Sequence, residues 1–212
     1  MDEPRTAALN PWRSIWLKPR ATIRQIVVSN PDHHVVALAA AGGVLQTLTN
    51  AVGENYGDRM GLIPILLIAL LIAPIFGVVA LYLTALLLRW TGRWLGGVAP
   101  LGELRAAIAW GSAPMVMGGV GMLVALLVSG HDLFSTVQPW LVRHPKLMMI
   151  AGIGMMVQGV AALWSVVSAI KCVAEVQGFS AWRALGNYLL VILVVAAVAF
   201  VVVAGVMLIT GK

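Results

Sequence analysis

Two long apolar runs of this chain are joined by residues 89–114, RWTGRWLGGVAPLGELRAAIAWGSAP. This joining segment carries four charged side chains, Arg89, Arg93, Glu103 and Arg105. We therefore expect it to lie in water or at a headgroup boundary, while the runs on either side lie in lipid. Its Gly-Gly pair can end one helix, and the Pro-Leu-Gly-Glu sequence can begin the next with an acid in its first turn. The sequence predicts a structured turn between two membrane-spanning helices.

The composition of the whole chain agrees with a membrane location. Of the 212 residues 60% are hydrophobic and only 10% are charged, and the mean hydropathy is +0.94. Such a chain has too little polar surface to cover a water-soluble globule. The net charge of +6 comes from Lys and Arg scattered among the connections, so it does not predict a nucleic-acid partner. The single cysteine, Cys172, cannot form a disulfide within the chain.

Five apolar runs are long enough to span a bilayer, so the predicted fold is all-α and polytopic. We place the spans at about residues 34–52, 62–88, 104–128, 147–170 and 182–209. Pro74 and Pro114 lie inside the second and third spans, where each should kink its helix because proline removes a backbone hydrogen bond.

The N-terminal arm, residues 1–33, is basic and has no apolar run that resembles a signal sequence. Trp12, Ile15 and Trp16 recur at helical spacing, and Pro19 can open a second short amphipathic helix. Two interpretations remain open: the arm lies flat on the membrane as an interfacial anchor, or it packs beneath the helix bundle.

The distribution of basic residues predicts the orientation of the chain. The arm, the 89–105 turn and the 171–183 turn fall on one side of the membrane and hold ten of the fourteen Lys and Arg residues. This excess indicates a cytoplasmic N-terminus in a bacterial inner membrane, with the C-terminus on the opposite side.

A short internal similarity suggests a repeated helical hairpin. Residues 101–107, LGELRAA, align with residues 179–185, FSAWRAL, and each segment begins a predicted span. Spans two and three would then be a parallel copy of spans four and five, as in some transporters. The alternative is that helices leaving the cytoplasm commonly begin with a small residue and carry an arginine at the lipid boundary.

Three stretches together resemble the prokaryotic branch of the Yip1-domain family. They are residues 10–24 (NPWRSIWLKPRATIR), residues 102–114 (GELRAAIAWGSAP) and residues 177–185 (QGFSAWRAL). The resemblance implies an all-helical integral membrane protein with about five spans and a cytoplasmic N-terminus. Eukaryotic relatives are linked to vesicle trafficking and Rab GTPases, but their long cytosolic N-terminal region is missing here, so we do not expect Rab binding.

No enzyme signature is present in the sequence. It has no Gly-x-Ser-x-Gly motif, phosphate loop or nucleotide fingerprint, and we predict neither catalysis nor a cofactor. Histidines cluster with Asp32 at residues 33–34 and with Asp132 at residues 131 and 144, without the spacing or the cysteine partners of strong metal sites. We interpret them as interfacial residues rather than metal ligands, and the ten methionines as packing residues.

The candidate functional residues are polar side chains in or beside the spans. A first set lies at corresponding helix ends and could pair across the bundle as a gate or a partner-docking rim: Glu103, Arg105, Glu175 and Arg183. The alternative is that the two acids and two arginines act independently at the lipid boundary. A second set could line a path for a neutral solute: Gln46, Asn50, Gln158 and Asn187.

These features predict a non-enzymatic membrane protein that organises membranes or binds partners. The expected partners are membrane lipids and either a second copy of the chain or another membrane protein. A small-solute or ion transporter built from the repeated hairpin is the alternative function. A polar, water-wide cavity between spans one, three and five would favour transport, whereas a dry bundle would favour the scaffold.

Overall fold

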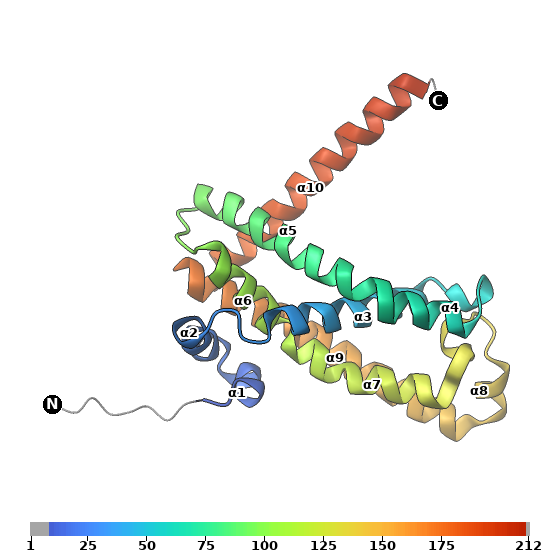
Figure 1. Ribbon diagram of the computed structural model, residues 1–212. Coiled ribbons are helices and arrows are strands. Elements are labelled where there is room, and N and C mark those ends of the chain that lie inside the picture. Colours follow the sequence, from blue (N-terminus) through green and yellow to red (C-terminus); the bar gives the residue numbers. More distant parts are fainter. Residues whose placement is uncertain (1–8, 211–212) are drawn as a thin grey trace.

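The computed structural model describes residues 9–210, and every regular element in this range is a helix (Figure 1). Five helical segments are long and apolar enough to cross a membrane, which confirms the predicted all-α, multi-pass fold. Arg5 and Lys212, which contribute to the predicted orientation, lie outside the described residues.

Two of the five spans are interrupted, so they comprise several elements. In chain order the spans are α3 (Val35–Gly53); α4 (Leu62–Leu67), the π-helix η2 (Ile68–Ile72) and α5 (Ala73–Trp94); α6 (Leu101–Gly111) and α7 (Ala113–Ser129); α9 (Pro145–Gln177); and α10 (Ala181–Thr210). The arm forms α1 (Pro11–Leu17) and α2 (Pro19–Ser29), and the remaining short helices are η1 (Tyr56–Asp58), η3 (Gly130–Phe134) and α8 (Pro139–Arg143).

The two interruptions coincide with Pro74 and Pro114. The π-helix η2 ends just before Pro74. Because proline has no backbone N–H, a regular α-helix would leave one carbonyl without a donor at this place. The third span breaks at Ser112, two residues before Pro114, and the Ser112 hydroxyl donates a 2.7 Å hydrogen bond to the Ala109 carbonyl. At each proline the helix is therefore irregular, because the proline lacks a backbone hydrogen-bond donor.

Small residues set the close contacts between the spans. A Cβ added to Gly121 on α7 would collide with the backbone of Gly154 on α9, and one added to Gly43 on α3 would lie 2.9 Å from the Cα of Gly77 on α5. Lipid gives no hydrophobic advantage to helix association, so such backbone approaches are what hold the helices together. The contacts of Gly118 with Ala161 and of Gly111 with Ala169 extend the α6–α7 and α9 interface.

The described part of the arm packs against the bundle. Ile15 and Ile23 are fully buried, and the Trp12 ring lies 5.0 Å from the ring of Trp110 on α6. The carbonyl of Trp16 accepts a 2.9 Å hydrogen bond from the indole of Trp164 on α9. The arm is thus a folded part of the domain.

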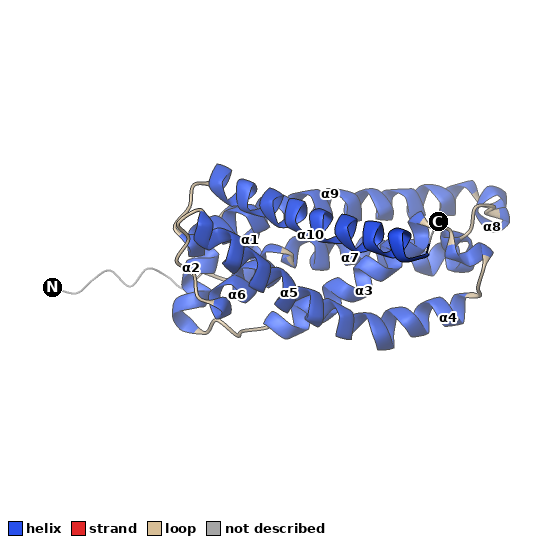
Figure 2. Ribbon diagram, turned by 90° about the horizontal axis from the view of Figure 1, so that it is seen from above, coloured by secondary structure: helices blue, strands red, loops and turns tan. Residues whose placement is uncertain are grey.

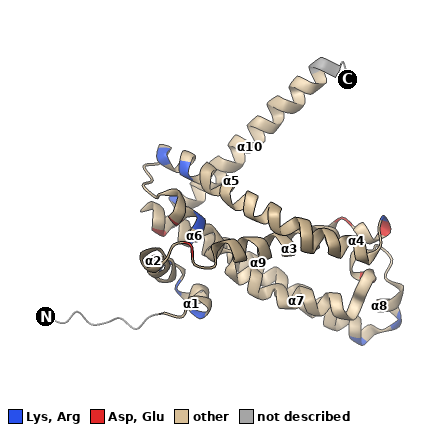
Figure 3. Cartoon of the chain, viewed as in Figure 1, with Lys and Arg blue, Asp and Glu red and all other residues tan. Residues whose placement is uncertain are grey.

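The helices run between two ends of the molecule, which we call the arm end and the α8 end. The arm end holds α1, α2 and the turns before α6 and α10, and the α8 end holds η1, η3 and α8 (Figure 1). Lys, Arg, Asp and Glu gather at these two ends and leave the middle of the bundle without charge (Figure 3). The first four spans run side by side between the ends (Figure 2), whereas α10 leaves the bundle at the arm end and extends away from it (Figure 1).

Candidate functional site

The arm end is built by two turns that close in the same way. Gly96 (φ +82°) ends α5 and Gly178 (φ +70°) ends α9, both in the left-handed region that favours glycine. In each turn the N–H that follows the left-handed glycine donates back to a carbonyl five residues earlier, Gly97 to Gly92 at 2.8 Å and Phe179 to Ala174 at 2.7 Å. The helix α5 continues to Trp94, beyond residue 88 at which the predicted span ends.

A buried cluster of hydrogen bonds ties the two turns together, and we call it the polar knot: Leu88, Thr91, Gln177 and Asn187. The Asn187 and Gln177 side-chain amides donate to the Leu88 carbonyl at 3.0 and 3.2 Å, and the Thr91 hydroxyl donates to Asn187 Oδ1 at 2.5 Å. Thr91, Gln177 and Asn187 are all buried. Buried polar groups are costly unless paired, so these bonds fix α5, α9 and α10 in one arrangement at the arm end.

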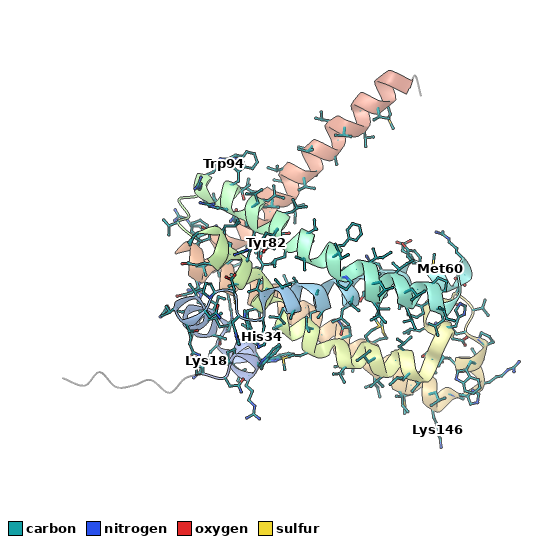
Figure 4. All side chains as sticks on the ribbon, viewed as in Figure 1. Lys18, His34, Met60, Tyr82, Trp94 and Lys146 are labelled. Carbon is teal, nitrogen blue, oxygen red and sulfur yellow. The ribbon has the colours of Figure 1, made fainter. Side chains whose placement is uncertain are left out.

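Arg105 on α6 contacts one residue on α5 and one in the turn between α2 and α3. Its Nη1 donates to the Tyr82 hydroxyl on α5 at 2.8 Å, its guanidinium lies 4.9 Å from the centre of the Tyr82 ring, and its Nη2 lies 3.3 Å from Asp32. Figure 4 shows Tyr82 on the part of α5 nearest to α6. The Nε of Arg105 is buried without a hydrogen bond.

The other three predicted rim residues do not join Arg105. Glu175 accepts two hydrogen bonds from Arg24 of the arm, one of them 2.7 Å from Nε, and its side chain is 15% exposed. Arg183 is exposed on the first turn of α10, and Glu103 is half-buried on the first turn of α6. Within residues 9–210 the four side chains make no ion pair with one another, because the arm supplies the partners of Arg105 and Glu175.

The four residues predicted to line a polar path lie at three separate places. Gln46 and Asn50 are exposed on α3 and bond to each other at 2.9 Å. Gln158 is buried on α9, with its Oε1 near Gly118 and without a hydrogen bond, and Asn187 belongs to the polar knot. The structure does not bring these side chains together.

An apolar groove of about 450 Å³ lies between α3, α5 and α6. Small residues form much of its floor, including Ala39, Gly42, Gly43 and Gly77, and Gln46 is the one predicted polar-path residue in its wall. This groove is apolar and lies between spans one, two and three, so it is not the predicted polar cavity between spans one, three and five.

The last span leaves most of its surface uncovered. Its most apolar segment has a mean hydropathy of 3.3, and none of that segment is buried by the rest of the described chain. Val191 is the last buried residue among the described side chains of α10, which end at Met207, and most of the large side chains from Ile192 to Met207 are exposed. Groups of three or more potential metal ligands are absent from the part of the chain that the structure describes.

The model of the Yip1 domain matches residues 13–203 of the chain. The chain belongs to the Yip1-domain family. The matched region begins in α1 and ends in α10, so the arm and the diverging last span are both parts of the Yip1 domain. No curated protein and no solved structure matches the chain.

The structure adds residues to this Yip1 domain that sequence reasoning missed. Thr91 and Gln177 complete the polar knot, and Arg24 and Asp32 supply the partners of the predicted rim residues. A signal for the knot was present at Gln177, a polar residue beside the terminating Gly178, whereas Thr91 lies five residues before Gly96. The ion pairs have no such local signal in the sequence. Arg24 of the arm and Glu175 of α9, for example, are 151 residues apart in the chain.

Proposed function

We propose that this Yip1-domain protein is a non-enzymatic membrane scaffold that binds the transmembrane helix of a partner along the outer half of α10. The observation that carries this proposal is that the most apolar segment of α10 has no residue buried against its own bundle. The helix is nevertheless fixed at its base by the polar knot and by the buried Ala184. A rigidly based helix with uncovered sides offers a partner a pre-ordered surface, which lowers the entropy cost of binding.

The sequence of α10 provides one face suited to close helix contact. Ala197 and Ala204, which are seven residues apart, share a face of the helix, and Ala196 and Gly205 flank that face. Small residues allow two helix backbones to approach and so support association in lipid. The opposite face carries bulkier residues such as Val195 and Val202, which suit contact with lipid chains.

The rim at the arm end has a secondary part in this proposal. Arg183 at the base of α10 and Glu103 at the base of α6 are the predicted rim residues without an ion pair among the described contacts, so they are available to polar groups of a partner. In this proposal the arm end lies in the cytoplasm of a bacterial cell, and the excess of basic residues at that end supports this orientation. No cofactor enters the proposal, and no specific observation favours the transporter alternative.

Photocrosslinking in intact membranes tests the scaffold. A photoreactive amino acid at position 197 should give a discrete protein adduct, because it lies on the small-residue face. The matched control is position 195, which is about 200° away around the helix and should give mainly lipid adducts. An adduct of twice the chain mass would identify a second copy as the partner, and a different mass would identify another membrane protein. Equal protein adducts from both positions, or none from either, would contradict the proposal.

A further inference from the structure

The groove between α3, α5 and α6 has the dimensions and the surface of a site for one alkyl chain. It is lined along α3 from Leu38 to Thr47, a helical rise of ~14 Å. Its walls are almost wholly apolar, and it is open on one side rather than closed over by other helices. A groove of this kind within the membrane-spanning segments meets lipid chains, not water.

The arm end of the groove carries a positive charge. Leu81, Ile108 and Ala109 line the groove, and the contact between Arg105 and Tyr82 lies directly beside them on the same two helices. The Arg105 side chain is only 22% exposed, and its buried Nε makes no hydrogen bond. Each Nη of Arg105 carries a second N–H beyond the one that reaches Tyr82 or Asp32, so the guanidinium is able to bind an anion in addition to its present partners.

The neighbouring charges leave a net positive potential at this point. Asp32 is the carboxylate in contact with Arg105, but it is 73% exposed and its contact of 3.3 Å is long for a charged pair. Arg89 lies seven residues after Tyr82 on the same face of α5, and its buried Nε also lacks a hydrogen bond. These two arginines outnumber the one acid in contact with Arg105.

We propose that this groove binds an anionic phospholipid, with one acyl chain along α3 and α5 and the phosphate against Arg105. Arg89 adds positive charge on the same face. An apolar channel that ends in a half-buried arginine at the membrane boundary complements a molecule with one long tail and one anionic head. Basic pockets between spanning helices on the cytoplasmic side bind lipid headgroups in this way. The site is separate from α10, so it stands independently of the partner-binding proposal.

Native mass spectrometry of the delipidated, detergent-solubilised full chain tests the site, with dioleoyl phosphatidylglycerol and dioleoyl phosphatidylcholine as the two probes. The wild type should retain one phosphatidylglycerol more tightly than phosphatidylcholine. Arg105→Gln should weaken phosphatidylglycerol binding about tenfold, the loss expected for one charged hydrogen-bonding partner, and should weaken phosphatidylcholine binding less, because choline offsets the charge of that lipid's phosphate. Arg183→Gln is the matched control, since it removes an exposed arginine at the same end of the molecule.

A second pair of variants tests the tail site without changing charge. A Cβ on Gly42 meets no atom within 4 Å and Gly42 lines the groove, so Gly42→Leu should fill the groove and reduce the binding of both lipids. Gly159→Leu is the control, because Gly159 is equally open but exposed on α9. Arg105→Lys, which keeps the charge but loses the planar fork, should fall between the wild type and Arg105→Gln. Equal retention of the two lipids by the wild type, or unchanged retention in Arg105→Gln and Gly42→Leu, would overturn the proposal.

Discussion

The third and fifth spans begin alike and end in opposite environments. Each comes after a helix closed by a left-handed glycine, Gly96 or Gly178, and each starts beside the polar knot. In the third span, α6 and α7, 44% of the most apolar segment is buried by other helices, whereas in α10 none of it is. The two spans therefore differ in their apolar segments and not in the turns that precede them.

The sequences of the two spans explain why one is buried among other helices and the other is exposed. The third span has a mean hydropathy of 1.9 and brings Gly111, Gly118 and Gly121 against α9, while α10 reaches 3.3 with Val, Leu and Ile. Because lipid is as apolar as leucine, greater hydropathy does not drive a helix into a bundle. The more apolar of these two spans is the one that faces outward.

Filling the α7–α9 crossing should give the largest effect. Gly121→Leu would force a side chain into the backbone of Gly154 and should lower the free energy of unfolding by about 3 kcal/mol. Gly205→Leu on α10 meets open space and should change the free energy of unfolding by less than about 0.5 kcal/mol. Unfolding in mixed detergent micelles, followed by near-ultraviolet circular dichroism, measures both. Similar losses in the two variants would remove the distinction between the packed and the diverging span.

Opening the polar knot should have the next largest effect. Asn187→Leu removes the acceptor of Thr91 and one donor to the Leu88 carbonyl in a buried site, which should cost about 1–2 kcal/mol. Gln46→Leu is the control, since Gln46 is exposed and bonds only to Asn50 among the described contacts. The same unfolding assay applies, and an Asn187→Leu variant as stable as Gln46→Leu would show that the knot does not fix the base of α10.

Releasing the arm should have a smaller effect. Arg24→Gln leaves Glu175 without its ion-pair partner and should cost about 0.5–1 kcal/mol, because Arg24 itself is largely exposed. The rate of amide hydrogen exchange in α2 should rise several-fold relative to the wild type, because exchange follows the free energy of local opening of the arm. Arg20→Gln, an exposed arginine on the same helix, is the control. Unchanged exchange in Arg24→Gln would mean that the buried isoleucines alone hold the arm.

The smallest predicted effect lies at the α8 end and depends on pH. The Thr136 hydroxyl and backbone N–H donate to Asp58, at 2.5 and 3.1 Å, and these hydrogen bonds lower the pKa of the Asp58 carboxyl from its ordinary value of 3.8. A carboxyl whose pKa is lower in the folded than in the unfolded protein adds stability at pH values above its unfolded pKa. That stabilisation is lost as the pH falls through its folded pKa. Asp58→Asn should thus melt slightly below the wild type at pH 7, and the two melting temperatures should converge below pH 3.8. A difference that persists at low pH would contradict the role of the charged form.

The membrane spans could be predicted from the sequence because long apolar runs, prolines and terminating glycines act locally. The π-helix before Pro74 and the break at Ser112 each reflect one missing N–H. The contacts of the candidate rim could not be predicted, because Arg105 and Glu175 pair with arm residues that are distant in the chain. The divergence of α10 was missed for a different reason: an apolar helix satisfies its own backbone equally well against protein or lipid.

Oxygen accessibility of spin labels along α10 would show whether this helix stands apart from the bundle in lipid. Single labels at residues 192 to 206 would be measured in nanodiscs that each hold one copy of the protein, without partner proteins. We expect high accessibility to lipid-dissolved oxygen at every position, because no face of the outer half is covered by its own bundle. A 3.6-residue period, with low accessibility on one face, would show that α10 packs against the bundle and would contradict its role as an open partner-binding helix.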